Sequence, residues 1–152
     1  MYELKIDLSG SKETKKMLKD LAVLSKDMKP FFKDTQTDIE KLMGKVFANE
    51  GLPKWKPRKD KLPHKRLQKT GRLRRSFTDE GAEGAHRKIS KTALEYGSGV
   101  MVGSYNLAAL HHYETKNRPA RQIFTRMVEN AIKVIVINKL KKFYKKTIKE
   151  GR

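Results

Sequence analysis

The sequence predicts an α+β fold in which a small antiparallel sheet, formed by an N-terminal strand and a hairpin, packs with two N-terminal helices and a long C-terminal helix. Residues 2–8 alternate apolar and polar side chains, which is the period-2 pattern of a half-buried strand. Residues 11–47 and 127–148 instead repeat apolar side chains at helical spacing. Residues 87–104 place apolar side chains on both sides of a glycine-rich turn, which predicts the hairpin.

The length of 152 residues fits a single domain, 1–152, because a domain of this size buries about 68–70% of the surface of its extended chain. The chain has no cysteine, which excludes disulfides and thiolate metal sites. No apolar run approaches the roughly 18 residues of a membrane-spanning helix, and residues 1–5 lack the features of a signal peptide. We therefore expect a protein that is made in a cytoplasm and has no membrane partner.

Two helices are expected after the N-terminal strand. Serine and glycine end the strand at residues 9–11, and the hydroxyl of Ser11 can cap the first helix. The apolar face of this first helix consists of Leu18, Leu21 and Leu24. The second helix is expected to begin near Asp27, to tolerate Pro30 in its first turn, and to stop at residues 49–51.

Residues 51–69 are predicted to form a long basic loop, because they contain three prolines and eight Lys or Arg residues and show neither helical nor strand periodicity. A loop of this length in a compact domain usually has a function. It contains the single tryptophan of the chain, Trp55. This side chain either plugs the core and thereby pins the loop, or lies exposed as an anchor for a partner.

A short helix is predicted for residues 71–78. The hydroxyl of Thr70 can cap it, and Gly71 permits a close approach at the turn. Leu73 and Phe77 are four residues apart and therefore share one face, whereas the arginines between them point elsewhere. The small and polar residues that follow, 79–85, predict a flexible turn.

The predicted hairpin, 87–104, has its turn at residues 97–99, and the N-terminal strand can join its edge. A short helix is expected at 107–113. The final helix carries an apolar stripe, but its middle is apolar nearly all round, as in a helix that is buried or shared with another subunit. The β-branched run 132–137 could alternatively form a strand.

The net charge of +19 is distributed unevenly. Residues 51–80 contain eleven Lys or Arg against three acidic residues, and residues 125–152 contain nine against two. Residues 1–50, by contrast, are nearly balanced, with ten lysines and nine acidic residues. Such basic segments favour association with nucleic acid or with an acidic protein surface, although they say nothing about the fold.

Nothing in the sequence predicts catalysis. The four histidines, His64, His86, His111 and His112, lack the spacing that would direct two imidazoles at one metal ion. The carboxylates are scattered among lysines or lie in the predicted turn, and no phosphate-binding glycine motif occurs. We therefore predict a protein that is not an enzyme, with no catalytic, cofactor-binding or metal-binding residues and no small-molecule substrate.

Three motifs occur in a recognisable order along the chain. They are Trp55-Lys56-Pro57, then Leu67-Gln68-Lys69-Thr70-Gly71-Arg72-Leu73, and finally Pro119-Ala120-Arg121. Between the last two lie Val102-Gly103-Ser104, then Ala108 and His111. This order and spacing resemble the phage virion morphogenesis (tail completion) family. The chain departs from the family pattern at Leu107 and Glu114, where Tyr and Gly are usual.

The resemblance implies a structural protein of the phage neck or tail end, which completes the tail and aids head-to-tail joining during virion assembly. Its partners would be other neck or tail subunits, including copies of itself in a ring, and its final location would be the virion. The resemblance gives these motif residues: Leu67, Thr70, Gly71, Leu73, Phe77, Gly103, His111 and Pro119.

The basic segments supply most of the candidate partner-binding residues, to which two apolar residues of the final helix are added. They are Lys54, Trp55, Arg58, Arg72, Arg75, Arg121, Ile135 and Phe143. The alternative function is non-specific DNA binding during genome packaging, because Lys and Arg neutralise phosphates whatever the fold. A metal-dependent nuclease is the weakest of the three hypotheses, since it needs clustered acidic residues.

Overall fold

The computed structural model describes residues 2–6, 27–57, 67–113 and 120–150. This part of the chain has an α+β fold, as the sequence predicts. In chain order its elements are β1 (Tyr2–Ile6), α2 (Lys29–Ala48), α3 (Arg72–Thr78), β2 (Ala85–Ile89), β3 (Leu94–Ser98), β4 (Met101–Val102), β5 (Tyr105–Asn106), α4 (Leu107–His112) and α5 (Arg126–Glu150).

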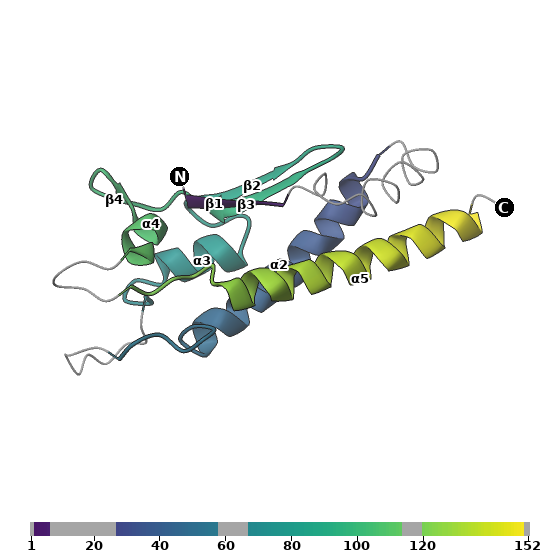
Figure 1. The fold of residues 1–152 in the computed structure, drawn as a ribbon. Helices are drawn as coiled ribbons and strands as arrows, with labels where there is room; N and C mark the ends of the chain where they lie inside the picture. Colours follow the sequence, from purple (N-terminus) through teal and green to yellow (C-terminus); the bar gives the residue numbers. More distant parts are fainter. Residues whose placement is uncertain (1, 7–26, 58–66, 114–119, 151–152) are drawn as a thin grey trace.

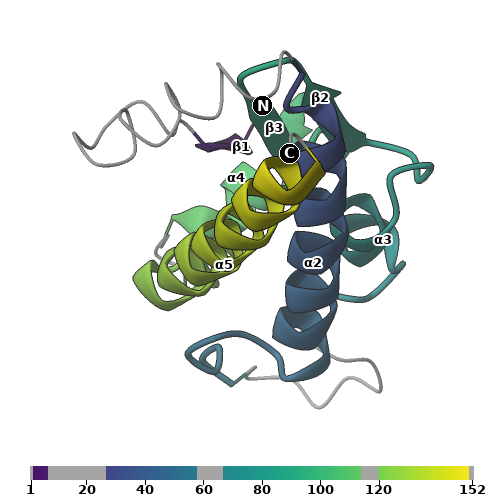
Figure 2. The ribbon, with the colours of Figure 1, turned by 90° about the vertical axis from the view of Figure 1, so that its right-hand side faces the viewer.

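The strands β1, β3 and β2 form a three-stranded antiparallel sheet in that spatial order (Figure 1). The helices α2, α3 and α5 lie on one side of this sheet, and α5 extends well beyond it. The helices α2 and α5 pack against each other, as the rotated view also shows (Figure 2). The N-terminal strand therefore joins the edge of the hairpin as predicted, through β3.

The predicted hairpin exists, but its turn does not lie at residues 97–99. Strand β2 pairs with β3 from Ala85↔Ser98 to Ile89↔Leu94, so the turn comprises residues 90–93. The hydroxyl of Ser90 accepts hydrogen bonds from the backbone N–H groups of residues 92 and 93, which lets a polar tetrapeptide close the hairpin without glycine. A Ser-based turn of this kind is a weaker sequence signal than a glycine run.

The glycine run that suggested the turn has two other roles. Gly97 is a buried residue of β3 and pairs with strands on both sides. Gly99 follows the strand and donates its N–H to the carbonyl of Gly84 over 2.7 Å. Gly84 has a φ of +74°, and a Cβ there would lie 2.7 Å from a methyl carbon of Val100. The absence of a side chain at Gly84 therefore permits close backbone approach where β3 ends.

Beyond β3 the chain forms a second, two-stranded ribbon. Strand β4 pairs with β5, with Val102 opposite Tyr105, and Gly103 turns between them at a φ of +59°. The following helix α4 agrees with the short helix predicted at 107–113, and the side chain of Asn106 caps it by accepting the N–H of Ala109.

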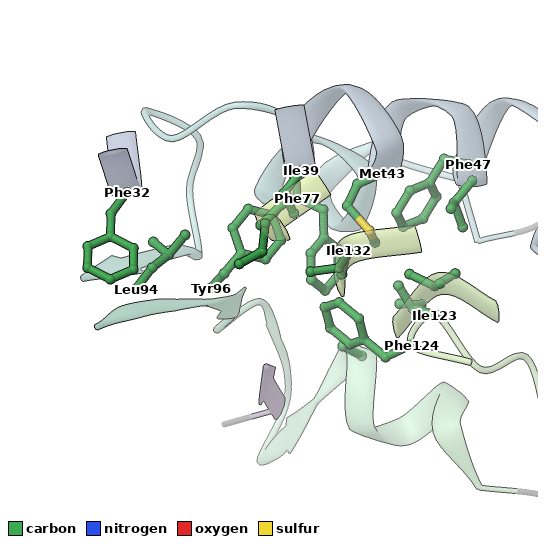
Figure 3. Packing of buried hydrophobic residues seen from close by; sticks show 14 of the residues in the cluster. Phe32, Ile39, Met43, Phe47, Phe77, Leu94, Tyr96, Ile123, Phe124 and Ile132 are labelled. Carbon is green, nitrogen blue, oxygen red and sulfur yellow. The ribbon is translucent and has the colours of Figure 1, made fainter. Parts of the chain in front are cut away.

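Phe77 lies at the centre of the hydrophobic core (Figure 3). Its ring contacts the rings of Phe47, Tyr96 and Phe124, with centroids 6.0, 6.2 and 5.6 Å away. Phe77 belongs to α3, whereas the three rings around it belong to α2, to β3 and to the segment that precedes α5. Phe77 therefore joins elements that are distant in the sequence.

The long helix α5 confirms the predicted C-terminal helix, and the strand alternative for residues 132–137 is wrong. Val128, Ile132, Val136 and Leu140 are all buried, and their spacing of four residues places them on one helical face. This face packs toward α2. Burial at helical period thus outweighs the preference of Val and Ile for extended backbone.

Helix α2 confirms the second predicted helix, with Pro30 in the first turn. The first predicted helix, from Ser11, lies outside the described residues. No helix in the described part of the chain is long and apolar enough to cross a membrane.

A charged cluster joins α2 to α5. The Lys139 ammonium on α5 lies 2.7 Å from a carboxylate oxygen of Asp34 and 3.0 Å from one of Asp38 on α2. Hydrogen bonding to Asp34, followed by that to Asp38, raises the pKa of Lys139. The hydrogen bond from Lys139 lowers the pKa of the Asp38 carboxyl. The three charges therefore stabilise the packing of the two long helices.

Replacing Lys139 with methionine is expected to lower the free energy of unfolding by about 1 kcal/mol near neutral pH. The contribution of Asp38 is complete above its unfolded-state pKa, roughly 4, and is lost as pH falls through the lowered folded-state value. The contribution of Lys139 is complete below roughly pH 10 and is lost as pH rises through its raised folded-state pKa. The urea midpoints of the wild type and of Lys139→Met should therefore differ most between roughly pH 4 and pH 10. Lys142→Met, at an exposed position of α5, is the control.

Candidate functional site

The motif at residues 67–77 forms the junction between the basic loop and α3. Leu67 is half-buried against the core, and the side-chain amide of Gln68 donates to the carbonyl of Phe47 over 2.7 Å. Leu73 and Phe77 are buried on one face of α3, as their spacing predicts. The motif therefore attaches the returning end of the basic loop to the C-terminal end of α2.

The predicted cap of this helix needs correction. Gly71, not Thr70, occupies the N-cap position, and its φ of +70° is the left-handed conformation that glycine adopts without strain. A Cβ on Gly71 would meet only the Arg75 side chain, at 3.7 Å, so backbone conformation and not close approach explains the glycine. Thr70 lies one position earlier, where its hydroxyl accepts the N–H of Arg72 over a long 3.4 Å.

Trp55 plugs the core at the start of the basic loop. Only 5% of it is exposed, and its ring packs edge to face on Phe47. Its indole N–H donates to the backbone carbonyl of Gln122 over 2.9 Å. The hydroxyl of Thr125 donates to the carbonyl of Leu52 in the same region. Of the two roles considered for Trp55, the structure thus shows the first, because the side chain holds the loop between α2 and the segment before α5.

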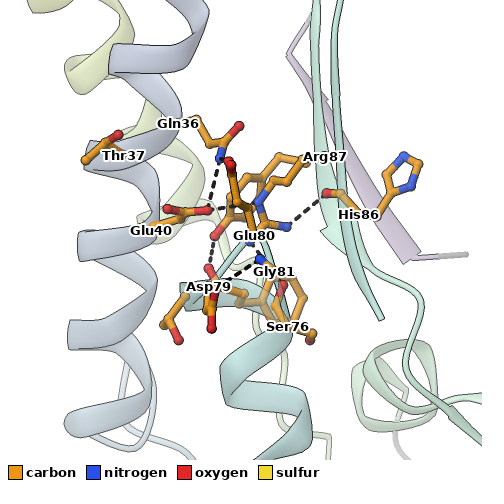
Figure 4. A network of polar contacts seen from close by, with 12 residues as sticks. Gln36, Thr37, Glu40, Ser76, Asp79, Glu80, Gly81, His86 and Arg87 are labelled. Atoms are coloured by element: carbon orange, nitrogen blue, oxygen red, sulfur yellow. Dashed lines mark hydrogen bonds and ion pairs between the residues drawn. The ribbon is translucent and has the colours of Figure 1, made fainter. Parts of the chain in front are cut away.

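A buried polar network connects the sheet with α2 and α3 (Figure 4). The Arg87 side chain is only 7% exposed, and its Nε lies 3.1 Å from a carboxylate oxygen of Glu40. Its terminal nitrogens donate to the carbonyls of His86, Gly97 and Ser76 over 2.9, 3.0 and 3.0 Å. Every nitrogen of the guanidinium therefore has an acceptor.

Aromatic and turn residues complete the network. The Arg87 guanidinium carbon lies 3.9 Å from the ring centroid of Tyr96, a cation–π contact. Burial raises the pKa of Tyr96, so its phenol stays protonated and donates to the carbonyl of Phe77. The turn that was predicted to be flexible contributes Glu80, whose carboxylate accepts hydrogen bonds from Lys33 and Gln36.

Glu40 is one of the carboxylates that the sequence places among lysines on a solvated helix face, and this interpretation is wrong because its side chain is only 17% exposed. Arg87 was not a candidate, although a signal for it exists. Residues 85, 87 and 89 share one face of β2, and an arginine between Ala85 and Ile89 on an inward face requires buried acceptors. The network contains no nucleophile aligned with a base. Its geometry is that of a structural connection between three elements.

The described histidines do not form a metal site. The imidazole of His86 lies 3.5 Å from the carboxylate of Glu95, while His111 and His112 are half-buried on α4. Among the residues that the structure describes, no group of three or more His, Asp or Glu side chains is placed to hold a metal ion. The backbone carbonyl of His111 accepts the N–H of Arg121 over 2.8 Å, which links two of the sequence motifs.

The candidate partner-binding residues differ in their exposure. Lys54 and Arg75 are exposed, whereas Arg72 is half-buried and forms an ion pair with Glu83 over 2.6 Å. Arg121, the arginine of the last motif, is only 9% exposed. Arg58 and Pro119 lie outside the described residues. The basic surface thus includes the start of the loop and the outer side of α3.

The apolar candidates on α5 are partly covered by the chain itself. Ile135 is half-buried, and the ring of Phe143 packs on Phe31 with centroids 5.8 Å apart. Three further apolar residues of α5 are at least half exposed, in the helix that the sequence predicts to be buried or shared with another subunit, but they were not among the partner-binding candidates. These are Met127 at 51%, Val134 at 57% and Ile137 at 51%.

The exposed part of α5 is also basic. Its exposed lysines are Lys133, Lys141, Lys142, Lys145 and Lys146. The class of molecule that this geometry defines is a small α+β protein whose exposed apolar and basic side chains share one long helix. No family model, curated protein or solved structure matches this chain. The resemblance to the tail completion family therefore stays a prediction that rests on the motifs.

Proposed function

We propose that this chain is a structural protein of a phage neck or tail end, which completes the tail and aids head-to-tail joining during virion assembly. The observation that carries the proposal is the outer side of α5, where Val134 and Ile137 are more than half exposed beside exposed lysines. Exposed apolar side chains on a structured helix are typical of a surface that is covered by a neighbouring subunit. The order of the motifs supplies the phage context.

Charge and apolar contact would have separate roles in assembly. The cations at Lys54, at Arg75 and along α5 would attract an acidic surface on a neck or tail subunit and raise the rate of association. The exposed apolar residues would then provide the contact that excludes water. Neither role needs a catalytic residue, so the proposed protein is not an enzyme and needs no cofactor.

The proposal is tested by electron microscopy of lysates from the phage or prophage that encodes this chain, with a stop codon at Trp55. The expected result is filled heads lying apart from unjoined tails, with intact virions restored when the gene is supplied in trans. Intact virions without complementation would contradict the proposal. Empty heads beside normal tails would instead favour a function in genome handling.

Reversing exposed charge should weaken assembly without unfolding the protein. The combined substitution Lys54→Glu and Arg75→Glu changes two exposed side chains at the basic loop and α3. We expect at least a tenfold fall in virion yield, because each reversal replaces attraction with repulsion at the docking surface. The matched control is Lys88→Glu with Lys91→Glu, which reverses two exposed charges at the β2–β3 hairpin. Equal yields from the two variants would contradict the docking role of the loop.

The same basic surface favours one alternative, non-specific DNA binding during genome packaging. A protein that contacts Z phosphates loses affinity with a log–log salt slope of about −0.9Z, whereas contact between apolar subunit surfaces survives moderate salt. Titration of duplex DNA across salt concentrations distinguishes the two functions. A steep slope that is reduced by the Lys54→Glu and Arg75→Glu substitutions would favour the alternative.

A further inference from the structure

We propose that copies of this chain associate head to tail, with the β4–β5 ribbon of one copy contacting the outer side of α5 of the next. The ribbon patch is defined as Val102 and Tyr105, which are paired across β4 and β5 and therefore share one face of the ribbon. The helix patch is defined as Met127, Val134 and Ile137. This inference rests on the proposed function and deepens it, because it assigns the two surfaces through which copies of the chain contact each other.

The ribbon patch is apolar and lies in the one long stretch of the chain that has no charge. Val102 and Tyr105 are 50% and 65% exposed, and the turn residue between the two strands, Gly103, is exposed too. Residues 96–113 contain no Lys, Arg, Asp or Glu, in a chain of which 35% is charged. The ribbon and α4 lie together at the end of the molecule from which α5 extends away (Figure 1).

The helix patch lies on the side of α5 that faces away from the core. At about 100° per residue, Val134 lies nearly opposite the midpoint of the buried row that begins at Val128, and Ile137 and Met127 lie on either side of it. All three side chains are at least half exposed. Exposed cations at Lys133 and Lys141 flank the patch.

Charge decides between the ways in which two copies can cover these patches. A net charge of +19 opposes any contact between copies that brings cations together. Contact between two helix patches would place the lysines of both copies at one interface. The uncharged ribbon patch, by contrast, can approach the lysine-flanked helix patch without repulsion between side chains.

Coverage of both patches favours the same arrangement. Contact between two ribbon patches would close a two-fold dimer and leave the helix patch of each copy exposed to water. Contact between a ribbon patch and a helix patch covers both kinds of patch. Because it joins two different surfaces of the same chain, it repeats from copy to copy and produces a ring or a filament.

The test uses two variants of the full chain that each lose one patch. The ribbon variant carries Val102→Lys and Tyr105→Lys, and the helix variant carries Val134→Lys and Ile137→Lys. All four positions are half exposed or more, so the fold should tolerate the substitutions. Circular dichroism verifies that each variant is folded. The control carries Thr37→Lys and Thr92→Lys, which add the same charge at exposed positions of α2 and the β2–β3 turn. Molar mass is measured by sedimentation velocity.

The wild-type chain and the control are expected to form species larger than a monomer, while each patch variant alone remains monomeric. An equimolar mixture of the two variants should double the mass to two chains and grow no further, because only one intact ribbon–helix contact can form. A dimer of the helix variant alone would overturn the proposal in favour of contact between ribbons. A dimer of the ribbon variant alone would point to contact between helices.

A wild-type chain that remains monomeric at its limit of solubility would also overturn the proposal. These measurements use purified protein without phage particles. Their failure would therefore leave the proposed tail-completion function to be judged by the lysate experiment. Conversely, intact virions from the interrupted gene would refute that function while self-association remained measurable.

Discussion

Replacement of Arg87 with methionine is expected to lower the free energy of unfolding by about 3–5 kcal/mol, which is typical of breaking a buried ion pair by removing one partner. The Glu40 side chain is only 17% exposed and would lose the cation that compensates its charge. The carbonyls of His86, Gly97 and Ser76 would lose their guanidinium donors as well. Methionine fills most of the volume but donates no hydrogen bond.

Urea unfolding at neutral pH measures this loss, with Arg74→Met as the control on an exposed arginine of α3. The double variant of Arg87→Met and Glu40→Gln should recover part of the stability, because the glutamine carries no uncompensated charge. The coupling energy from the double-mutant cycle reports the interaction itself. A loss below about 1 kcal/mol, as for a surface pair, would contradict the structural role of the network.

Replacement of Phe77 with alanine is expected to destabilise the protein by about 3–5 kcal/mol, the usual range for a fully buried phenylalanine. Its side chain is completely buried, and its ring contacts Phe47, Tyr96 and Phe124. Alanine would leave a cavity where α2, α3, β3 and the segment before α5 meet. The surrounding rings come from different elements, so they cannot collapse together to fill it.

The measurement is again the urea midpoint, and Phe143→Ala is the matched control. Phe143 is half-buried and contacts Phe31 near the exposed end of the α2–α5 pair. Its replacement with alanine should therefore lower the free energy of unfolding clearly less than Phe77→Ala does. Equal effects of the two substitutions would mean that the core is not centred on α3. The motif residue Phe77 would then have to be explained by another role.

Much of the fold could be predicted because the periodicity of apolar residues is a local property of the sequence. The alternation after Tyr2, the helical spacing of α2 and α5, and the pair Leu73 and Phe77 all agree with the structure. Periodicity alone left residues 132–137 ambiguous. The segment is a helix because the buried row that begins with Val128 and Ile132 packs against α2.

The hairpin turn could not be predicted from the same local signals. A glycine run at 97–99 suggests a turn, but Gly97 lies within β3 and Gly99 directly follows that strand. Only the pairing of β3 with strands on both sides shows which role applies. The burial of Trp55 likewise depends on the carbonyl of Gln122, which is 67 residues away.

The sequence by itself determined the α+β class, the helices α2 and α5, the short helix α3 and the separation of basic from balanced segments. These features follow from the spacing of apolar residues and from the number of charged residues within short segments of the sequence. Only the tertiary structure decided the strand order, the role of Trp55, the network around Arg87 and the exposure of Val134. These depend on contacts between residues that are far apart in the chain, and local patterns carry no information about which distant surfaces meet.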